Sequence, residues 1–109
     1  MNLTEEEAIL FNPKRFAIVT VLYLRGPQTM AELKKAVGLT WGDLDSNLRY
    51  LARNKLVEIR KTIIRAGPRT IIKLTSKGEE SYKSLVEKLK KSKTYKVREK
   101  KEVKSYTYK

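Results

Sequence analysis

The chain contains neither cysteine nor histidine among its 109 residues. It therefore has no disulfide, no cysteine nucleophile, no imidazole acid or base, and none of the usual zinc-finger ligand sets. No apolar run approaches the roughly 20 residues that a membrane span requires. We expect a cytoplasmic binding protein that is not an enzyme, with no cofactor, no metal site, no catalytic residue and no membrane partner.

Acidic residues are scarce beside basic ones. The chain has 25 lysines and arginines against 12 aspartates and glutamates, a formal net charge of +13. Such a field attracts polyanions, so nucleic acid is the expected partner and association with the nucleoid the expected location. The length allows one small domain with a tail or arm, and an apolar fraction of 40% suffices for its core.

The most informative stretch is residues 40–55, TWGDLDSNLRYLARNK. Leu44, Leu48 and Leu51 recur at steps of three and four, which predicts a helix with one apolar stripe. The opposite face is slim at its start and basic towards its end, as a helix entering the major groove requires. That face consists of Gly42, Asp43, Ser46, Arg49, Tyr50 and Arg53.

Two helices are expected before this one. Asn12-Pro13 is a helix start, and Gly26-Pro27 stops that helix. Thr29 and Glu32 form a capping box that opens a second helix, which ends at Gly38. A turn of about three residues then leads to residues 40–55, the spacing of a helix-turn-helix.

The first eleven residues are interpreted as a short helix or arm. Thr4 and Glu7 match a capping box, and the segment ends in apolar residues. It could pack on the core as a flap or exchange between two protomers.

A β-hairpin is expected after residues 40–55. Residues 56–62 alternate as a half-buried strand does, Ile63 and Ile64 extend that strand, and residues 70–74 form a second one. The tip between them, residues 65–69, is basic and carries the turn signal Gly67-Pro68. We interpret residues 40–55 as the recognition helix, and two strands with a basic tip directly after it as a wing. Together they predict a DNA-binding domain over residues 12–75.

Residues 76–91 are predicted to form a C-terminal helix capped by Thr75 or Ser76. Its apolar stripe favours association with a second copy, although packing on its own domain remains an alternative. Residues 92–109 are rich in lysine and tyrosine and poor in aliphatic residues. A solvated tail or a mobile DNA-contacting arm is expected there rather than an ordered element.

In this order, residues 12 to about 91 resemble the winged-helix transcriptional regulators of the MarR/ArsR-like kind, above all the small archaeal and bacterial winged-helix domains. The stretches that carry the resemblance are NPKRFAIVTVL, MAELKKAVGLTWGDLDSNLRYLARNKLVEI and GPRTIIKLTSKGEE. Within them, Gly42-Asp43-Leu44 and Pro68-Arg69-Thr70 match recurring motifs of the group. The resemblance implies an α+β winged helix-turn-helix: a three-helix core, a two-stranded wing and a C-terminal dimerisation helix. It also implies a homodimer that binds double-stranded DNA, with the recognition helix in the major groove and the wing at the adjacent minor groove.

Three groups of binding residues are predicted. The recognition helix would use Gly42, Ser46, Asn47, Arg49, Tyr50 and Arg53. The wing would use Arg60, Lys61, Arg65 and Arg69. The dimer would form through Tyr82, Leu85, Val86 and Leu89.

Within the recognition helix, Ser46 and Asn47 are the candidates for base edges, and the arginines for phosphates. Asp43 favours a structural role near the cap, with a cytosine contact as the alternative. Trp41 is expected to cover the core near the turn, or else to line a pocket for an effector that the sequence does not identify. An architectural protein that coats DNA with little sequence preference is the alternative function, and a protein adaptor or RNA-binding winged helix is a third.

Overall fold

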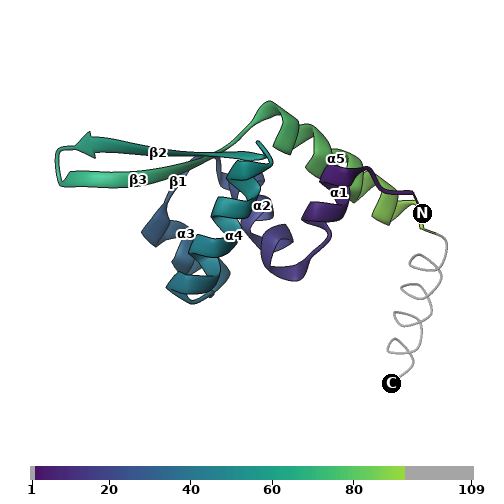
Figure 1. The fold of residues 1–109 in the computed structure, drawn as a ribbon, viewed down its shortest axis with the longest axis horizontal. Helices are drawn as coiled ribbons and strands as arrows, with labels where there is room; N and C mark the ends of the chain where they lie inside the picture. The colour runs from purple at the N-terminus through teal and green to yellow at the C-terminus, as the bar shows by residue number, and fades with distance from the viewer. Residues whose placement is uncertain (1, 93–109) are drawn as a thin grey trace, which may run out of the picture.

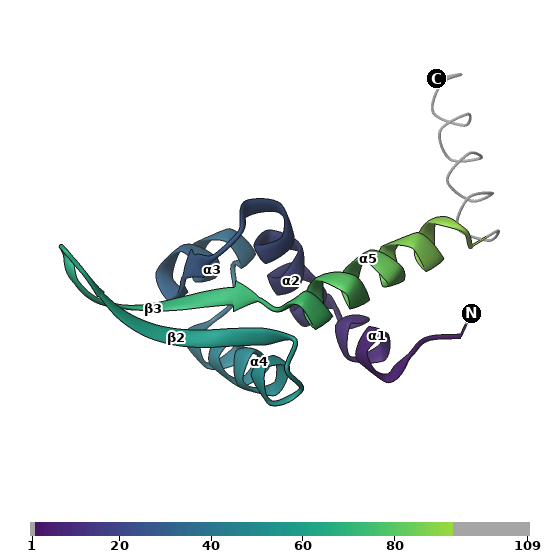
Figure 2. The same ribbon diagram turned by 90° about the horizontal axis from the view of Figure 1, so that it is seen from above.

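The computed structural model describes residues 2–92 of the chain. Its elements are α1 (Glu5–Leu10), α2 (Pro13–Arg25), β1 (Gln28–Thr29), α3 (Met30–Val37), α4 (Trp41–Arg53), β2 (Val57–Ile64), β3 (Gly67–Leu74) and α5 (Ser76–Lys90). Figure 1 shows the helices gathered beneath and beside the sheet, with the β2–β3 hairpin projecting past α3 and α4. In the view from above, α5 and α1 lie at the end of the molecule away from the hairpin tip (Figure 2). The expected α+β winged helix-turn-helix is confirmed.

The helix starts follow from local side-chain chemistry. Thr4 and Thr29 each accept a hydrogen bond from the backbone amide three residues on, and Glu7 and Glu32 bond back to the capping residues. Asn12 caps α2, with Pro13 in its first turn. The two predicted capping boxes and the predicted start of α2 are therefore confirmed.

The core forms where the apolar stripes of the helices meet the inner face of the sheet. Leu44, Leu48 and Leu51 of α4 are fully buried, as are Ile18 and Leu22 of α2. Trp41 does not join them: its side chain is 53% exposed, and the Lys34 ammonium lies 5.2 Å from the centre of its ring. The expectation that Trp41 covers the core is wrong, because the first turn of α4 carries that position out over α3.

The sheet has the order β1-β3-β2, and both strand pairs are antiparallel. Strand β1 is only two residues long, and it pairs Gln28 with Ile72 and Thr29 with Ile71. A strand this short has no visible alternation, so the sequence did not predict it.

The hairpin is longer than its sequence pattern suggested. Ile64 pairs directly with Gly67, so the turn consists of Arg65 and Ala66, and Pro68 and Arg69 already belong to β3. Gly67 has a φ of 117°, a value that side-chain-bearing residues rarely adopt. The predicted tip of five residues is therefore corrected to a turn of two.

Helix α5 docks closely against the start of the hairpin. The Thr75 hydroxyl donates to the carbonyl oxygens of Lys55 at 2.8 Å and Leu56 at 3.0 Å, and it accepts from the Gly78 amide at 3.0 Å. A Cβ atom at Gly78 would lie 2.1 Å from the Leu56 carbonyl oxygen, so only glycine fits there. This contact joins the helices to the hairpin at its base.

The N-terminal segment packs on the core as the flap that the sequence suggested. Ile9 and Leu10 are buried, and the Glu7 carboxylate, itself buried, lies 2.6 Å from the Lys88 ammonium of α5. The hydrogen bond from Lys88, followed by those from the Ser84 hydroxyl and the Thr4 amide, lowers the pKa of Glu7 to about 2. An ion pair thus fastens α1 to α5.

The apolar stripe of α5 is used mainly within its own domain. Tyr82 and Leu85 are buried in the core, while Val86 and Leu89 are partly buried against it. Tyr82 also packs against Phe16 and Tyr23 and shares a hydrogen bond of 2.9 Å with Thr20. The expectation about the lysine- and tyrosine-rich tail falls on residues 93–109, which lie outside the described part of the chain. No helix within residues 2–92 is long and apolar enough to cross a membrane.

Candidate nucleic-acid interface

Helix α4 presents one open face to solvent. Five of the six predicted recognition-helix residues are exposed on it, at intervals of three and four that place them together while the leucines point inwards. These five are Gly42, Ser46, Arg49, Tyr50 and Arg53.

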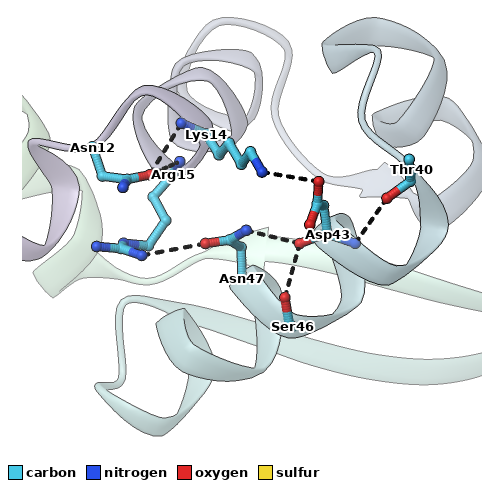
Figure 3. Close-up of polar contacts among 7 residues, drawn as sticks. All are labelled: Asn12, Lys14, Arg15, Thr40, Asp43, Ser46 and Asn47. Carbon is cyan, nitrogen blue, oxygen red and sulfur yellow. Dashed lines mark hydrogen bonds and ion pairs between the residues drawn. The ribbon is translucent and has the colours of Figure 1, made fainter.

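The sixth residue, Asn47, is half-buried, and both ends of its amide are engaged. Its Nδ2 donates to the Asp43 carbonyl oxygen at 2.8 Å, and its Oδ1 accepts from Nη1 of Arg15 at 3.3 Å (Figure 3). Ser46 is exposed, and its hydroxyl donates to the same carbonyl at a longer 3.3 Å. Of the two candidates for reading bases, Ser46 is therefore the more available.

Asp43 links two helices. Its backbone amide donates to the Thr40 hydroxyl, the cap of α4, and its carboxylate lies 2.9 Å from the Lys14 ammonium of α2 (Figure 3). The partner of the carboxylate is thus a cation from another helix rather than the free amide at the cap. This pair neutralises a positive charge in the first turn of α2, where the helix dipole disfavours cations.

Arg15 is a residue of the site that the sequence reasoning missed. Its Nε donates to the Ile9 carbonyl oxygen at 2.7 Å, and its guanidinium lies 4.8 Å from the centre of the Tyr50 ring. Together with the bond to Asn47, these contacts connect the end of α1 to the exposed face of α4. A signal was present, because Lys14 and Arg15 stand in the first turn of α2 without an acid there.

Two further arginines border the face of α4. Arg53 lies 5.9 Å from the centre of the Tyr50 ring, on which Arg15 also stacks. Arg49 pairs with Asp45 at 3.0 Å, yet its side chain is 70% exposed. An exposed pair of this kind contributes little to stability, so Arg49 can exchange its partner for a phosphate at small cost.

The predicted wing residues divide between the two faces of the hairpin. Arg60 lies opposite Ile71 and Arg69 opposite Thr62, which puts these two arginines on one face. Lys61, opposite Thr70, lies on the other face, and Arg65 stands in the turn. Arg60, Lys61 and Arg65 are exposed, whereas Arg69 is half-buried, with its Nη1 donating to the Pro68 carbonyl oxygen at 2.8 Å.

Most of the hairpin, from Ile59 onwards, and the first residues of α5 up to Gly78 carry charge of one sign only. Between Glu58 and Glu79 the chain has six lysines and arginines and no acid. An exposed basic hairpin beside an exposed helix with basic edges forms a surface suited to a polyanion.

Comparison with known proteins identifies the family to which this fold corresponds. Residues 14–92 match the family model described as a winged helix DNA-binding domain. An uncharacterized protein of Methanocaldococcus jannaschii is 35% identical over 72 residues, which span 66% of this chain and 78% of that protein.

Solved structures agree with the family match. A transcriptional regulator homologue from Pyrococcus horikoshii superimposes with a TM-score of 0.71 at 38% identity, covering 76% of this chain and 82% of that one. The transcriptional repressor BigR from Xylella fastidiosa superimposes with a TM-score of 0.61 at 22% identity, covering 73% and 74%. At that lower identity the likeness concerns the fold alone.

Proposed function

The chain belongs to the winged helix DNA-binding domain family, and on that premise we propose that it is a homodimeric transcription regulator that binds double-stranded DNA. In this proposal α4 lies in the major groove and the turn of the hairpin lies at the adjacent minor groove. The protein acts by binding and not by catalysis, in the cytoplasm and on the nucleoid.

The observation that carries the proposal is the exposure of cations on both elements. Arg49 and Arg53 border the open face of α4, and Lys61 and Arg65 are exposed on the hairpin. Each cation that meets a phosphate releases a condensed counterion, so affinity should fall steeply as salt rises.

The test is duplex affinity measured across a salt series for the full chain and for Arg65→Ala. If Arg65 contacts one phosphate, the slope of log affinity against log salt should become shallower by about one unit. Lys90→Ala on α5 removes the same charge at the other end of the molecule and should leave the slope unchanged. An unchanged slope and affinity for Arg65→Ala would remove the turn of the hairpin from the interface.

The proposed dimer rests on apolar surface at the α1–α5 end. Phe11, Pro13, Phe16 and Leu89 line an apolar hollow of about 320 Å³, and Phe11 is more than half exposed. Val86 and Leu89 remain the predicted α5 contacts, since Tyr82 and Leu85 are buried in the protomer. Sedimentation should give twice the 12.7 kDa mass of one chain. Half-sites on DNA should then lie about 10 to 10.5 base pairs apart, or a multiple of that distance.

A specific observation also favours the second candidate, an architectural protein with little sequence preference. The Asn47 amide is engaged within the protein, which leaves few uncharged groups on α4 to read base edges. Competition between a genomic site found by protection mapping and random duplex separates the two functions. A regulator should discriminate by about 10³-fold or more, and an architectural protein by little.

A further inference from the structure

The end of the hairpin exposes large apolar side chains, and contacts with phosphates do not explain their exposure. Ile63 is 82% exposed and Ile64 is 46% exposed, although both stand in a strand. Neither belongs to the apolar core. The 82% exposure of Ile63 next to the turn therefore indicates contact with a partner rather than packing within the chain.

Strand register shows how these side chains are grouped. Ile63 lies directly opposite Pro68, and Ile64 opposite Gly67. Directly opposite residues project from the same face of a hairpin, and successive residues from alternate faces. Ile63 and Pro68, which we name the apolar tip pair, thus form one apolar surface next to the turn, while Ile64 lies on the reverse face.

The apolar tip pair belongs to the strand face that packs on the helices at the base of the hairpin. Ile63 follows Val57, Ile59 and Lys61 at steps of two, and Val57 is buried against the helical core. Figure 1 shows α3 and α4 beneath the hairpin on that side, and the tip extends beyond them. A duplex seated against α4 would therefore meet this face of the tip.

The surroundings of the pair restrict the chemistry of its partner. Lys61 shares its face, and Arg65 occupies the turn. A matching partner has closely spaced negative charges with apolar surface between them. A DNA duplex has both, because its stacked bases lie between two rows of phosphates. The minor groove, about 6 Å wide, excludes a helix, but the narrow end of a hairpin can enter it.

Building on the proposed DNA-binding function, we propose that the apolar tip pair is a wedge that enters the minor groove and bends the duplex. Isoleucine and proline are among the side chains that proteins insert between base steps, partly unstacking them and kinking the duplex toward the major groove. The bend brings flanking phosphates towards the cations of the hairpin, and this added contact offsets the cost of unstacking.

The test uses a mixed-sequence duplex of about 30 base pairs with several TA steps, a type that kinks easily. Donor and acceptor dyes at its ends report bending, and 2-aminopurine at a TA step reports unstacking. The full-length protein should increase both energy transfer and 2-aminopurine fluorescence at saturation. Ile63→Ser should lose most of both increases and weaken binding about tenfold, because buried apolar surface is lost.

Ile64→Ser is the matched control. It makes the same chemical change one residue away, in the same strand, but on the reverse face of the hairpin. It should keep the bend and retain affinity within about twofold. Ile63→Met, which preserves an apolar side chain, should bend the duplex as the unmodified protein does, and thermal melting should show that all three variants fold.

The outcomes separate the wedge from the function on which it rests. Tight binding of an unbent duplex, or equal loss of bending in both serine variants, overturns the wedge and leaves the DNA-binding proposal standing. Failure to bind duplex even at low salt overturns both. Sedimentation with phosphatidylglycerol vesicles that depends on Ile63, with duplex bending unaffected by Ile63→Ser, would instead assign the pair to an anionic membrane surface.

Discussion

The helices and the β2–β3 hairpin both carry positive charge, but the cations differ in their partners. We call the five helices together the helical layer. In the helical layer Lys14 pairs with Asp43, Arg15 bonds Asn47 and the Ile9 carbonyl, and Lys88 pairs with buried Glu7. On the hairpin, the one ion pair among the described residues joins Arg60 to Glu58 at 4.0 Å, the outer limit for such a contact. Lys14, Arg15 and Lys88 therefore hold helices in position, whereas Lys61 and Arg65 on the hairpin are exposed and available to a partner.

The largest effect is expected at the joint between these two regions. Gly78→Ala would place a Cβ atom 2.1 Å from the Leu56 carbonyl oxygen, a backbone atom that cannot move aside cheaply. We expect the free energy of unfolding to fall by about 3 kcal/mol, measured by urea denaturation followed by circular dichroism. Gly42→Ala is the control, since a Cβ atom there meets nothing within 4 Å and should stabilise α4 by up to about 1 kcal/mol. Equal stability of the two variants would contradict the close docking of α5.

The next effect concerns the ion pair between Glu7 and Lys88. Because the folded pKa of Glu7 is about 2, below its ordinary value of 4.5, its ionised form is favoured by folding. The resulting stability is fully present above about pH 4.5 and is lost as the pH falls towards 2. Glu7→Gln should lower the free energy of unfolding at neutral pH by about 2 kcal/mol, since hydrogen bonds to a buried charge are among the stronger ones.

The measurement for this pair is stability as a function of pH. The unmodified protein should lose stability more steeply than Glu7→Gln between pH 4.5 and 2. Glu80→Gln, at an exposed glutamate of α5, serves as the control and should follow the unmodified protein. Parallel curves for the unmodified protein and Glu7→Gln would refute the role of this carboxylate.

The smallest expected changes in stability come from a comparison of two arginines, Arg15 in the helical layer and Arg65 on the hairpin. Arg15→Ala loses two hydrogen bonds and its stacking on Tyr50, which should cost about 1 to 2 kcal/mol. Arg65→Ala should change stability by no more than about 0.5 kcal/mol while weakening duplex binding. Arg15→Lys keeps the charge but not the forked geometry and should recover little of the loss. If Arg15→Ala were as stable as Arg65→Ala, the contrast between the two regions would disappear.

The features that the sequence predicted depend on neighbours along the chain. Thr4 with Glu7 and Thr29 with Glu32 gave the capping boxes, and Leu44, Leu48 and Leu51 gave the buried stripe of α4. Each pattern is confirmed because its physical cause lies within one or two helical turns.

The features that escaped prediction depend on residues distant in the chain. Arg15 meets Asn47 and Tyr50 of α4, Gly78 meets Leu56, and β1 exists through its pairing with β3. The length of the hairpin was underestimated because its outer strands bury little and so show no alternation of apolar and polar residues. These features follow from tertiary packing, which a single sequence does not display.

The two-residue strand β1 fixes the point from which the hairpin can flex. It holds β3 at Ile71 and Ile72, and beyond Ile71 no strand of residues 2–92 supports β3 on that side. The four residues from Thr70 back to Gly67 extend about 14 Å at 3.4 Å per residue. This part of β3 therefore projects beyond its last contact with β1, which is at Ile71. In the proposed complex with DNA, tilting about Ile71 would let the end of the hairpin follow grooves of different width while the helices stay in place.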